Sequence, residues 1–231
     1  MSDRTVVVDE VRTLLAQNGD PERAAGQQRY MKSAMPHHGI TSPQLRTLLR
    51  PVLAGWRPAS RTDWEGSVRE LWDQATHREQ RYAAVRLARH RVARVWRDAA
   101  AMPLWRHLVT TGAWWDLVDE IAAHPVRESL EADPAVVTPL LRDWAVDDDL
   151  WLRRTAVIAQ LQRAGETDLD LLRFAIEHNV ADPSFWLRKA IGWALRQYAR
   201  TDPDWVRAEV ARLEPLGLST LSRREALKHL G

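Results

Sequence analysis

The chain has 231 residues and a formal net charge of +2 at pH 7, and we expect residues 1–231 to form one domain. It contains no cysteine, which excludes disulfides, cysteine-ligated zinc and a thiol nucleophile. No stretch is apolar enough for a signal peptide or a membrane span, so we expect a soluble, cytoplasmic protein, a monomer, with no membrane partner.

Amphipathic helices account for most of the chain. Apolar residues recur at the i, i+3, i+4, i+7 spacing of helices, whereas the alternating pattern of strands is scarce. Five dipeptides have the composition of helix starts, because an Asp or Ser side chain caps free backbone N–H groups and proline suits the first helical position. They are Asp20-Pro21, Ser42-Pro43, Asp133-Pro134, Asp182-Pro183 and Asp202-Pro203. The fold class is therefore predicted to be all-α, with short helices arranged in pairs.

A basic block occupies residues 78–97. It holds seven arginines and one acid, Glu79, whereas residues 116–149 hold ten acids and two arginines. A basic block on a balanced chain indicates contact with a polyanion, and nucleic acid is the first candidate. An ordinary solvated helix face accounts for the same charges equally well. Among these arginines we expect Arg81 to contact DNA.

The stretch TTGAWWDLVDE (110–120) places two tryptophans beside two acids. On a helix over 114–122 the apolar stripe contains Trp114, whereas Trp115 and Asp119 lie off that stripe. Trp114 is therefore predicted to be a core residue. Most of the twelve tryptophans must be structural. An exposed indole beside a charge, however, more often marks a binding site.

One segment repeats with a period of 35 residues. LWLRRTAVIAQLQR (150–163) and FWLRKAIGWALRQY (185–198) align without gaps. A period of this length, made of helix pairs, is typical of HEAT-like α-solenoids, which stack helical hairpins into a curved array with a concave face. The same period relates Asp119, Arg154 and Lys189, so we expect these charges to line one wall.

The second copy of the segment also pairs an indole with a charge. On a helix over 187–198, Lys189 and Trp193 are four residues apart and lie off the core stripe. Lys189 suits a phosphate contact better than a Schiff base with a sugar, and we expect Arg153 to contact DNA as well.

At these residues the chain resembles the AlkD family of bacterial DNA glycosylases, HEAT-like repeat proteins that excise alkylated purines. The resemblance runs from about Arg29 to Leu230, in stretches that agree in order and spacing. These are RYMKSAMPHHGITSPQLR, RELWD, AWWDLVDEIA, WLRRTAVIAQLQ, RKAIGWALRQYARTDP and LSRREALKHL. His37 and His38 depart from the more apolar pattern of the family in their loop.

The resemblance implies roles for individual residues. Asp119 matches the catalytic carboxylate, and Trp115 and Trp193 match the aromatic walls of the lesion site. Arg154 matches a residue that contacts the DNA backbone, and Tyr30 is similar to the family's aromatic residue near the DNA.

The reaction that the resemblance implies is excision of 3-methyladenine or 7-methylguanine from duplex DNA, in the bacterial cytoplasm at the nucleoid. Alkylation makes the purine cationic and therefore a good leaving group. A fixed carboxylate, here Asp119, would stabilise the positive charge that develops on the deoxyribose. We expect no cofactor, and no metal, because the histidines lack metal-ligand spacing.

Two other functions fit parts of the sequence. One is a non-catalytic HEAT-like module that binds DNA structures through the arginine-rich face; retention of Asp119 favours catalysis over this alternative. The other is a protein-binding scaffold in which the off-stripe tryptophans line a peptide groove. The scaffold predicts no salt-dependent affinity for DNA, whereas the glycosylase and the DNA-binding module both require it.

Overall fold

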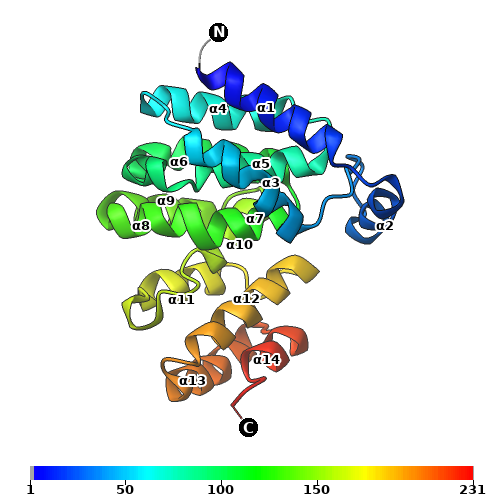
Figure 1. Ribbon diagram of the computed structural model, residues 1–231. Helices are drawn as coiled ribbons and strands as arrows, with labels where there is room; N and C mark the ends of the chain where they lie inside the picture. Colours follow the sequence, from blue (N-terminus) through cyan, green and yellow to red (C-terminus); the bar gives the residue numbers. More distant parts are fainter. Residues whose placement is uncertain (1–2, 231) are drawn as a thin grey trace. The chain divides into compact units, whose positions relative to one another are not determined.

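The computed structural model describes residues 3–230, with side chains from residue 6 onward. These residues form α-helices, short 3-10 helices and one π-helical turn, and none of them belongs to a strand (Figure 1). The prediction of an all-α solenoid of helical repeats is confirmed, while its curvature and concave face stay predictions. Within the same range, no helix combines the length and apolar character needed to cross a membrane.

The chain divides into two compact units, Met1–Trp96 and Arg97–Gly231. The first contains α1 (Asp3–Gln17), α2 (Pro21–Met31), α3 (Ser42–Gly55), α4 (Arg61–Asp73), α5 (Arg78–Ala88) and η1 (Arg91–Trp96). The second begins with η2 (Ala99–Ala101), α6 (Met102–Gly112), α7 (Trp115–Ile121), η3 (Ala122–Val126), α8 (Arg127–Ala132) and α9 (Pro134–Ala145). It continues with α10 (Leu150–Ile158), η4 (Ala164–Glu166), α11 (Leu169–Glu177), α12 (Phe185–Tyr198), α13 (Pro203–Leu213), η5 (Glu214–Leu216) and α14 (Thr220–Ala226). The expected single domain over 1–231 stays a prediction.

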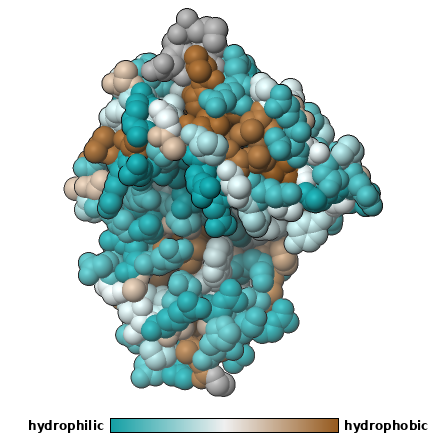
Figure 2. Space-filling model, in the orientation of Figure 1, coloured by the Kyte–Doolittle hydropathy of each residue, from teal (hydrophilic) through white to brown (hydrophobic). Residues whose placement is uncertain are grey.

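The core of the first unit forms around α4, which packs against α1 and α5. In α4, Trp64, Val68 and Trp72 recur every four residues and all three are fully buried. This spacing places them on one face of the helix, which therefore faces the core. Figure 2 shows that hydrophobic residues also reach the surface over α1 and α3, whereas the surface over α13 and α14 is mostly hydrophilic.

The one acid of the basic block is a structural residue. Glu79 is 0% exposed. Its carboxylate accepts hydrogen bonds from the backbone N–H groups of His38, Gly39 and Ile40 at 2.8–3.0 Å. Gly39 has a φ of +86°, and a Cβ there would lie 2.0 Å from the carbonyl oxygen of Asp20. Glu79 thus ties a tightly packed loop to α5 and does not belong to a solvated face.

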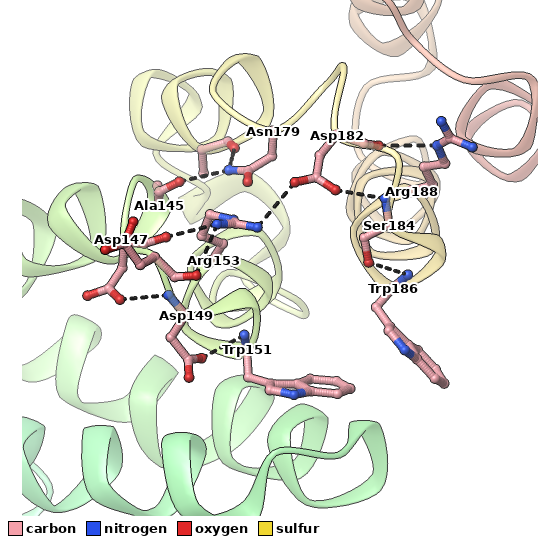
Figure 3. Close-up of polar contacts among 12 residues, drawn as sticks. Ala145, Asp147, Asp149, Trp151, Arg153, Asn179, Asp182, Ser184, Trp186 and Arg188 are labelled. Atoms are coloured by element: carbon pink, nitrogen blue, oxygen red, sulfur yellow. Dashed lines mark hydrogen bonds and ion pairs between the residues drawn. The ribbon is translucent and has the colours of Figure 1, made fainter.

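The predicted repeat appears in the second unit as two helices that pack together, α10 and α12. Two backbone contacts recur with the period. The guanidinium of Arg153 donates to the carbonyl oxygen of Asp147 at 3.0 Å, and Arg188 donates to that of Asp182 at 3.2 Å (Figure 3). Donors and acceptors are both 35 residues apart, so the loops that enter the two helices have the same construction.

Helix capping follows the predicted dipeptides at two positions. The carboxylate of Asp20 accepts from the N–H of Arg23 at 3.0 Å, and that of Asp202 accepts from the N–H of Trp205 at 2.9 Å. Thr41, not Ser42, caps α3.

The other two dipeptides serve loop packing instead of capping, which corrects the prediction. Asp182 accepts from the N–H of Ser184, and Ser184 caps α12. The side chain of Asp133 makes no capping bond and accepts from the N–H of Ala99 at 2.9 Å. Local sequence marks a helix start, but neighbouring segments compete for the same carboxylate.

Candidate active site

Asp119 and Arg154 form a two-point ion pair. Asp119 lies on α7 and Arg154 on α10, and the two helices pack against each other. The Nε and Nη2 atoms of Arg154 donate to Oδ1 and Oδ2 of Asp119 at 2.7 and 2.8 Å. Parallel bonds of this kind fix the orientation of the carboxylate as well as its position. The 35-residue period therefore predicted this neighbour correctly.

The guanidinium of Arg154 is held from a second side. Its Nη1 donates to the backbone carbonyl of Trp186, at the start of α12, and the residue is only 4% exposed. Arg154 therefore holds Asp119 in place. Its three hydrogen bonds use three of the five guanidinium N–H groups, and the predicted contact with the DNA backbone stays a prediction.

Asp119 is more enclosed than an outward-facing acid. Its side chain is 16% exposed. Burial raises the pKa of the Asp119 carboxyl above its ordinary value, and the charge of Asp116 adds to this effect, while the hydrogen bonds and charge of Arg154 oppose it. Arg154 thus offsets the cost of keeping an ionised carboxylate in a mostly buried position.

Trp115 and Trp193 lie off the core, as the helical pattern predicts. Both indoles are half-buried, and neither makes a ring contact within residues 6–230. Trp115 precedes Asp119 by one turn of α7, so the two share a face. Trp193 follows Trp186 by seven residues of α12, two turns along the same face and about 10 Å along the helix axis.

A cluster of three tryptophans, which the sequence analysis did not identify, flanks this ion pair. Ring centroids of Trp114, Trp151 and Trp186 lie 5.3–6.0 Å apart. Figure 3 shows the last two indoles side by side. Trp114 was predicted to be core, but it is only half-buried and stands at the N-cap of α7. The 35-residue spacing of Trp151 and Trp186 was the signal available in the sequence.

The other predicted DNA contacts of this unit are engaged within it. Besides the carbonyl of Asp147, Arg153 binds the carboxylate of Asp182 at 3.1 Å (Figure 3). Lys189 pairs with Glu225 at 3.0 Å. Arg153 therefore holds the loop before α10, and Lys189 must exchange Glu225 for a phosphate if it is to contact DNA. The DNA contacts of both residues stay predictions.

Tyr30 and Arg81 belong to the first unit. Tyr30, on α2, is 77% exposed, as a residue that meets a partner would be. The guanidinium of Arg81 lies 4.9 Å from the ring centroid of Trp72. Burial and the charge of Arg78 lower the pKa of Arg81, against the opposing charge of Asp73. The cation–π contact with a buried indole gives Arg81 a structural role.

Within the described residues, no group of three or more His, Asp or Glu side chains is arranged to hold a metal ion. The geometry instead supports chemistry by one oriented carboxylate, with aromatic faces on the same helix and on a helix that packs beside its arginine partner.

Comparison with known proteins shows the family of the chain. A solved structure described as a predicted DNA alkylation repair enzyme from Enterococcus faecalis is 29% identical, with a TM-score of 0.81 over 92% of this chain and 97% of that chain. No curated protein sequence is similar enough to count as a relative. The model of the family described as DNA alkylation repair enzyme matches residues 11–230. Because that match covers nearly the whole sequence, the chain belongs to the DNA alkylation repair enzyme family.

Proposed function

We propose that this chain is a monofunctional DNA glycosylase that hydrolyses the N-glycosidic bond of cationic alkylpurines in duplex DNA. The observation that carries the proposal is the carboxylate of Asp119, oriented by a two-point bond from Arg154 and still partly exposed. Its position matches the catalytic acid that the AlkD resemblance implies. A monomer acting at the bacterial nucleoid is part of the proposal.

Asp119 supplies charge where the reaction needs it. As the bond between C1′ and the purine nitrogen breaks, its electron pair stays on the purine and neutralises that base. Positive charge then develops on the deoxyribose, and a fixed carboxylate in a partly shielded site stabilises this transition state more than the ground state. Water bonds to C1′, and its proton passes through Asp119 to solvent.

Arg154 is a positioning residue in this scheme. Because its nitrogens hold both carboxylate oxygens and the carbonyl of Trp186, Asp119 is oriented before the substrate arrives. Such preorganisation avoids the cost of ordering the charge during the reaction.

Trp115 and Trp193 present indoles that no other ring among residues 6–230 covers, and Tyr30 presents an exposed phenol. An indole face attracts a cationic sugar or base by about 0.5–2 kcal/mol. We assign these residues to lesion binding, with capture from the backbone side as the family resemblance implies.

The test is release of free base from duplex DNA that contains 7-methylguanine, together with a measurement of strand breaks. We expect base release without direct strand cleavage. Asp119→Asn should lower excision at least about 100-fold and leave duplex affinity nearly unchanged, because one oriented charge is lost while the fold is kept. Full activity in this variant would refute the mechanism.

Glu120→Gln is the matched control. Glu120 adjoins Asp119 on α7, its side chain is 45% exposed, and its carboxylate lies 3.7 Å from the imidazole Nε2 of His124. The variant should excise base at the wild-type rate. A wild-type protein that binds DNA in a salt-dependent manner but releases no base would favour the non-catalytic DNA-binding module instead.

A further inference from the structure

An arginine-lined cavity lies within the first unit, between α3 and the end of α5. These two helices, which Figure 1 labels, pack together. It measures about 520 Å³. We call it the arginine cavity, and its charged or titratable lining consists of Arg46, Arg50, Arg86, Arg89, His90 and Arg91. The two arginines of α3 are four residues apart and therefore share one face of the helix.

The cavity lining contains no acidic side chain. Within residues 6–230, moreover, none of Arg46, Arg50, Arg86 and Arg91 has an ion pair with a carboxylate. Arg153 of the second unit differs, since it pairs with Asp182. The four arginines of the first unit thus bring to the cavity positive charge that no carboxylate of residues 6–230 pairs with.

Keeping these charges together is unfavourable in the free protein. Burial lowers the pKa of Arg86, and repulsion from Arg46 lowers it further. Arginine nevertheless keeps its proton in proteins, so the cluster remains cationic. An anion in the cavity would relieve the repulsion and accept forked hydrogen bonds from the guanidinium groups.

Helix stability explains only part of this arrangement. Arg86 lies in the last turn of α5 and Arg89 at its C-cap, where a positive charge favourably meets the helix dipole. Arg46 and Arg50, in contrast, lie within α3, away from the C-terminus of their own helix. The end of a helix carries only about half a unit of charge, so the dipole of α5 does not by itself account for this many arginines beside it.

The chemistry of the lining selects the kind of anion. Beside its cationic donors, the cavity offers the aliphatic side chains of Leu49, Leu53 and Ala54, and no carboxylate or amide that would read a base edge. Donors of this kind recognise phosphate without regard to sequence. We infer that the arginine cavity binds the sugar–phosphate backbone of duplex DNA. This inference rests on the proposed function for the choice of DNA as the polyanion.

The experiment measures affinity for an undamaged duplex as a function of salt, by fluorescence anisotropy. The test variant is Arg46→Gln with Arg50→Gln, because both side chains are exposed on α3 and their removal should leave the fold intact. The control is Arg207→Gln with Arg223→Gln, which removes two arginines that pair with Asp204 and Glu214. For each DNA phosphate that a variant no longer neutralises, the slope of log K against log salt should become shallower by about 0.9.

We expect the cavity variant to lose roughly 10-fold or more in affinity at low salt, with a slope shallower by about 1–2, while the control stays near wild type. Arg86→Gln offers a second variant. Because the charge of Arg86 is repelled by Arg46 but favoured by the dipole of α5, its removal should leave the melting temperature near that of the wild type. An unchanged slope and affinity in folded cavity variants would overturn the inference.

A second arm distinguishes DNA from a small phosphate. Inorganic phosphate is added at constant ionic strength, with chloride as the reference salt. If millimolar phosphate raises the melting temperature of the wild type but not of the cavity variant, while both bind the duplex with the same affinity and salt slope, the cavity serves a small anion and our inference is wrong. Since the duplex carries no lesion, these results stand apart from base excision. A protein without glycosylase activity would refute the proposed function and leave the cavity measurement valid.

Discussion

Guanidinium groups have opposite environments at two places in the molecule. One is Arg154 in the second unit, and the other is the arginine cavity in the first unit. Arg154 is buried, with its nitrogens bound to a carboxylate and a carbonyl. In the cavity, the charge of Arg46 repels that of Arg86, and the lining contains no acidic side chain. A guanidinium that is paired inside the fold orients its partner, whereas unpaired guanidinium groups are available to an external anion.

The presence or absence of a carboxylate partner also separates the predicted DNA contacts from the arginines of the cavity. Arg153, Arg154 and Lys189 were expected to contact DNA, but each has a carboxylate partner inside its own unit. Arg46 and Arg50 were not singled out, yet they, like Arg86 and Arg91, have no carboxylate partner within residues 6–230. Pairing in three dimensions thus decides which arginine charges remain available to a polyanion.

Removal of the paired arginine should have the largest effect on stability. Arg154→Gln leaves the mostly buried carboxylate of Asp119 without its counter-charge, so we expect a loss of about 3–5 kcal/mol in the free energy of unfolding. Urea denaturation measures this loss. Arg86→Gln, in the arginine cavity, should cost nothing. Equal losses in the two variants would break the comparison.

Two tryptophans extend this comparison of internal and external contacts: Trp114 contacts other rings of the protein, whereas Trp193 is proposed to contact the substrate. Trp114→Ala should destabilise the protein by roughly 2–4 kcal/mol, below the full cost for a buried indole because Trp114 is only half-buried. Trp193→Ala should leave stability nearly unchanged and slow excision by about 2- to 30-fold, as expected when one cation–π interaction with the substrate is removed. Urea unfolding and single-turnover excision measure these effects, and global unfolding of the Trp193 variant would assign that residue to the core.

The smallest expected effect is a shift in pH dependence. Burial and the charge of Asp116 raise the pKa of Asp119, and excision requires its ionised form, so activity should fall as pH drops through this raised pKa. Asp116→Asn removes one raising influence and should move the acid limb of the rate profile to lower pH. The rate of base release, measured between about pH 4 and 8 on pre-bound duplex, tests this. A shift to higher pH would contradict the assigned electrostatics.

Local patterns predicted the helices because helix formation depends on residues three and four positions apart. The 35-residue repeat also predicted a long-range contact. Asp119 and Arg154 occupy equivalent positions in adjacent repeats, and their side chains form a hydrogen bond. Where periodicity extends, sequence alone predicts neighbours one repeat away. The sequence alone could therefore identify the candidate acid and the off-stripe indoles.

Sequence by itself determined the all-α class, the repeat and which side chains lie off the helical cores. Only the tertiary structure decided which charges are neutralised. In the folded chain, Glu79 is buried and accepts hydrogen bonds from three backbone N–H groups. Arg154 is enclosed beside Asp119, and arginines of α3 lie near the end of α5. The physical reason is that hydrophobic periodicity is a property of one helix, whereas desolvation and charge pairing depend on everything that surrounds a side chain.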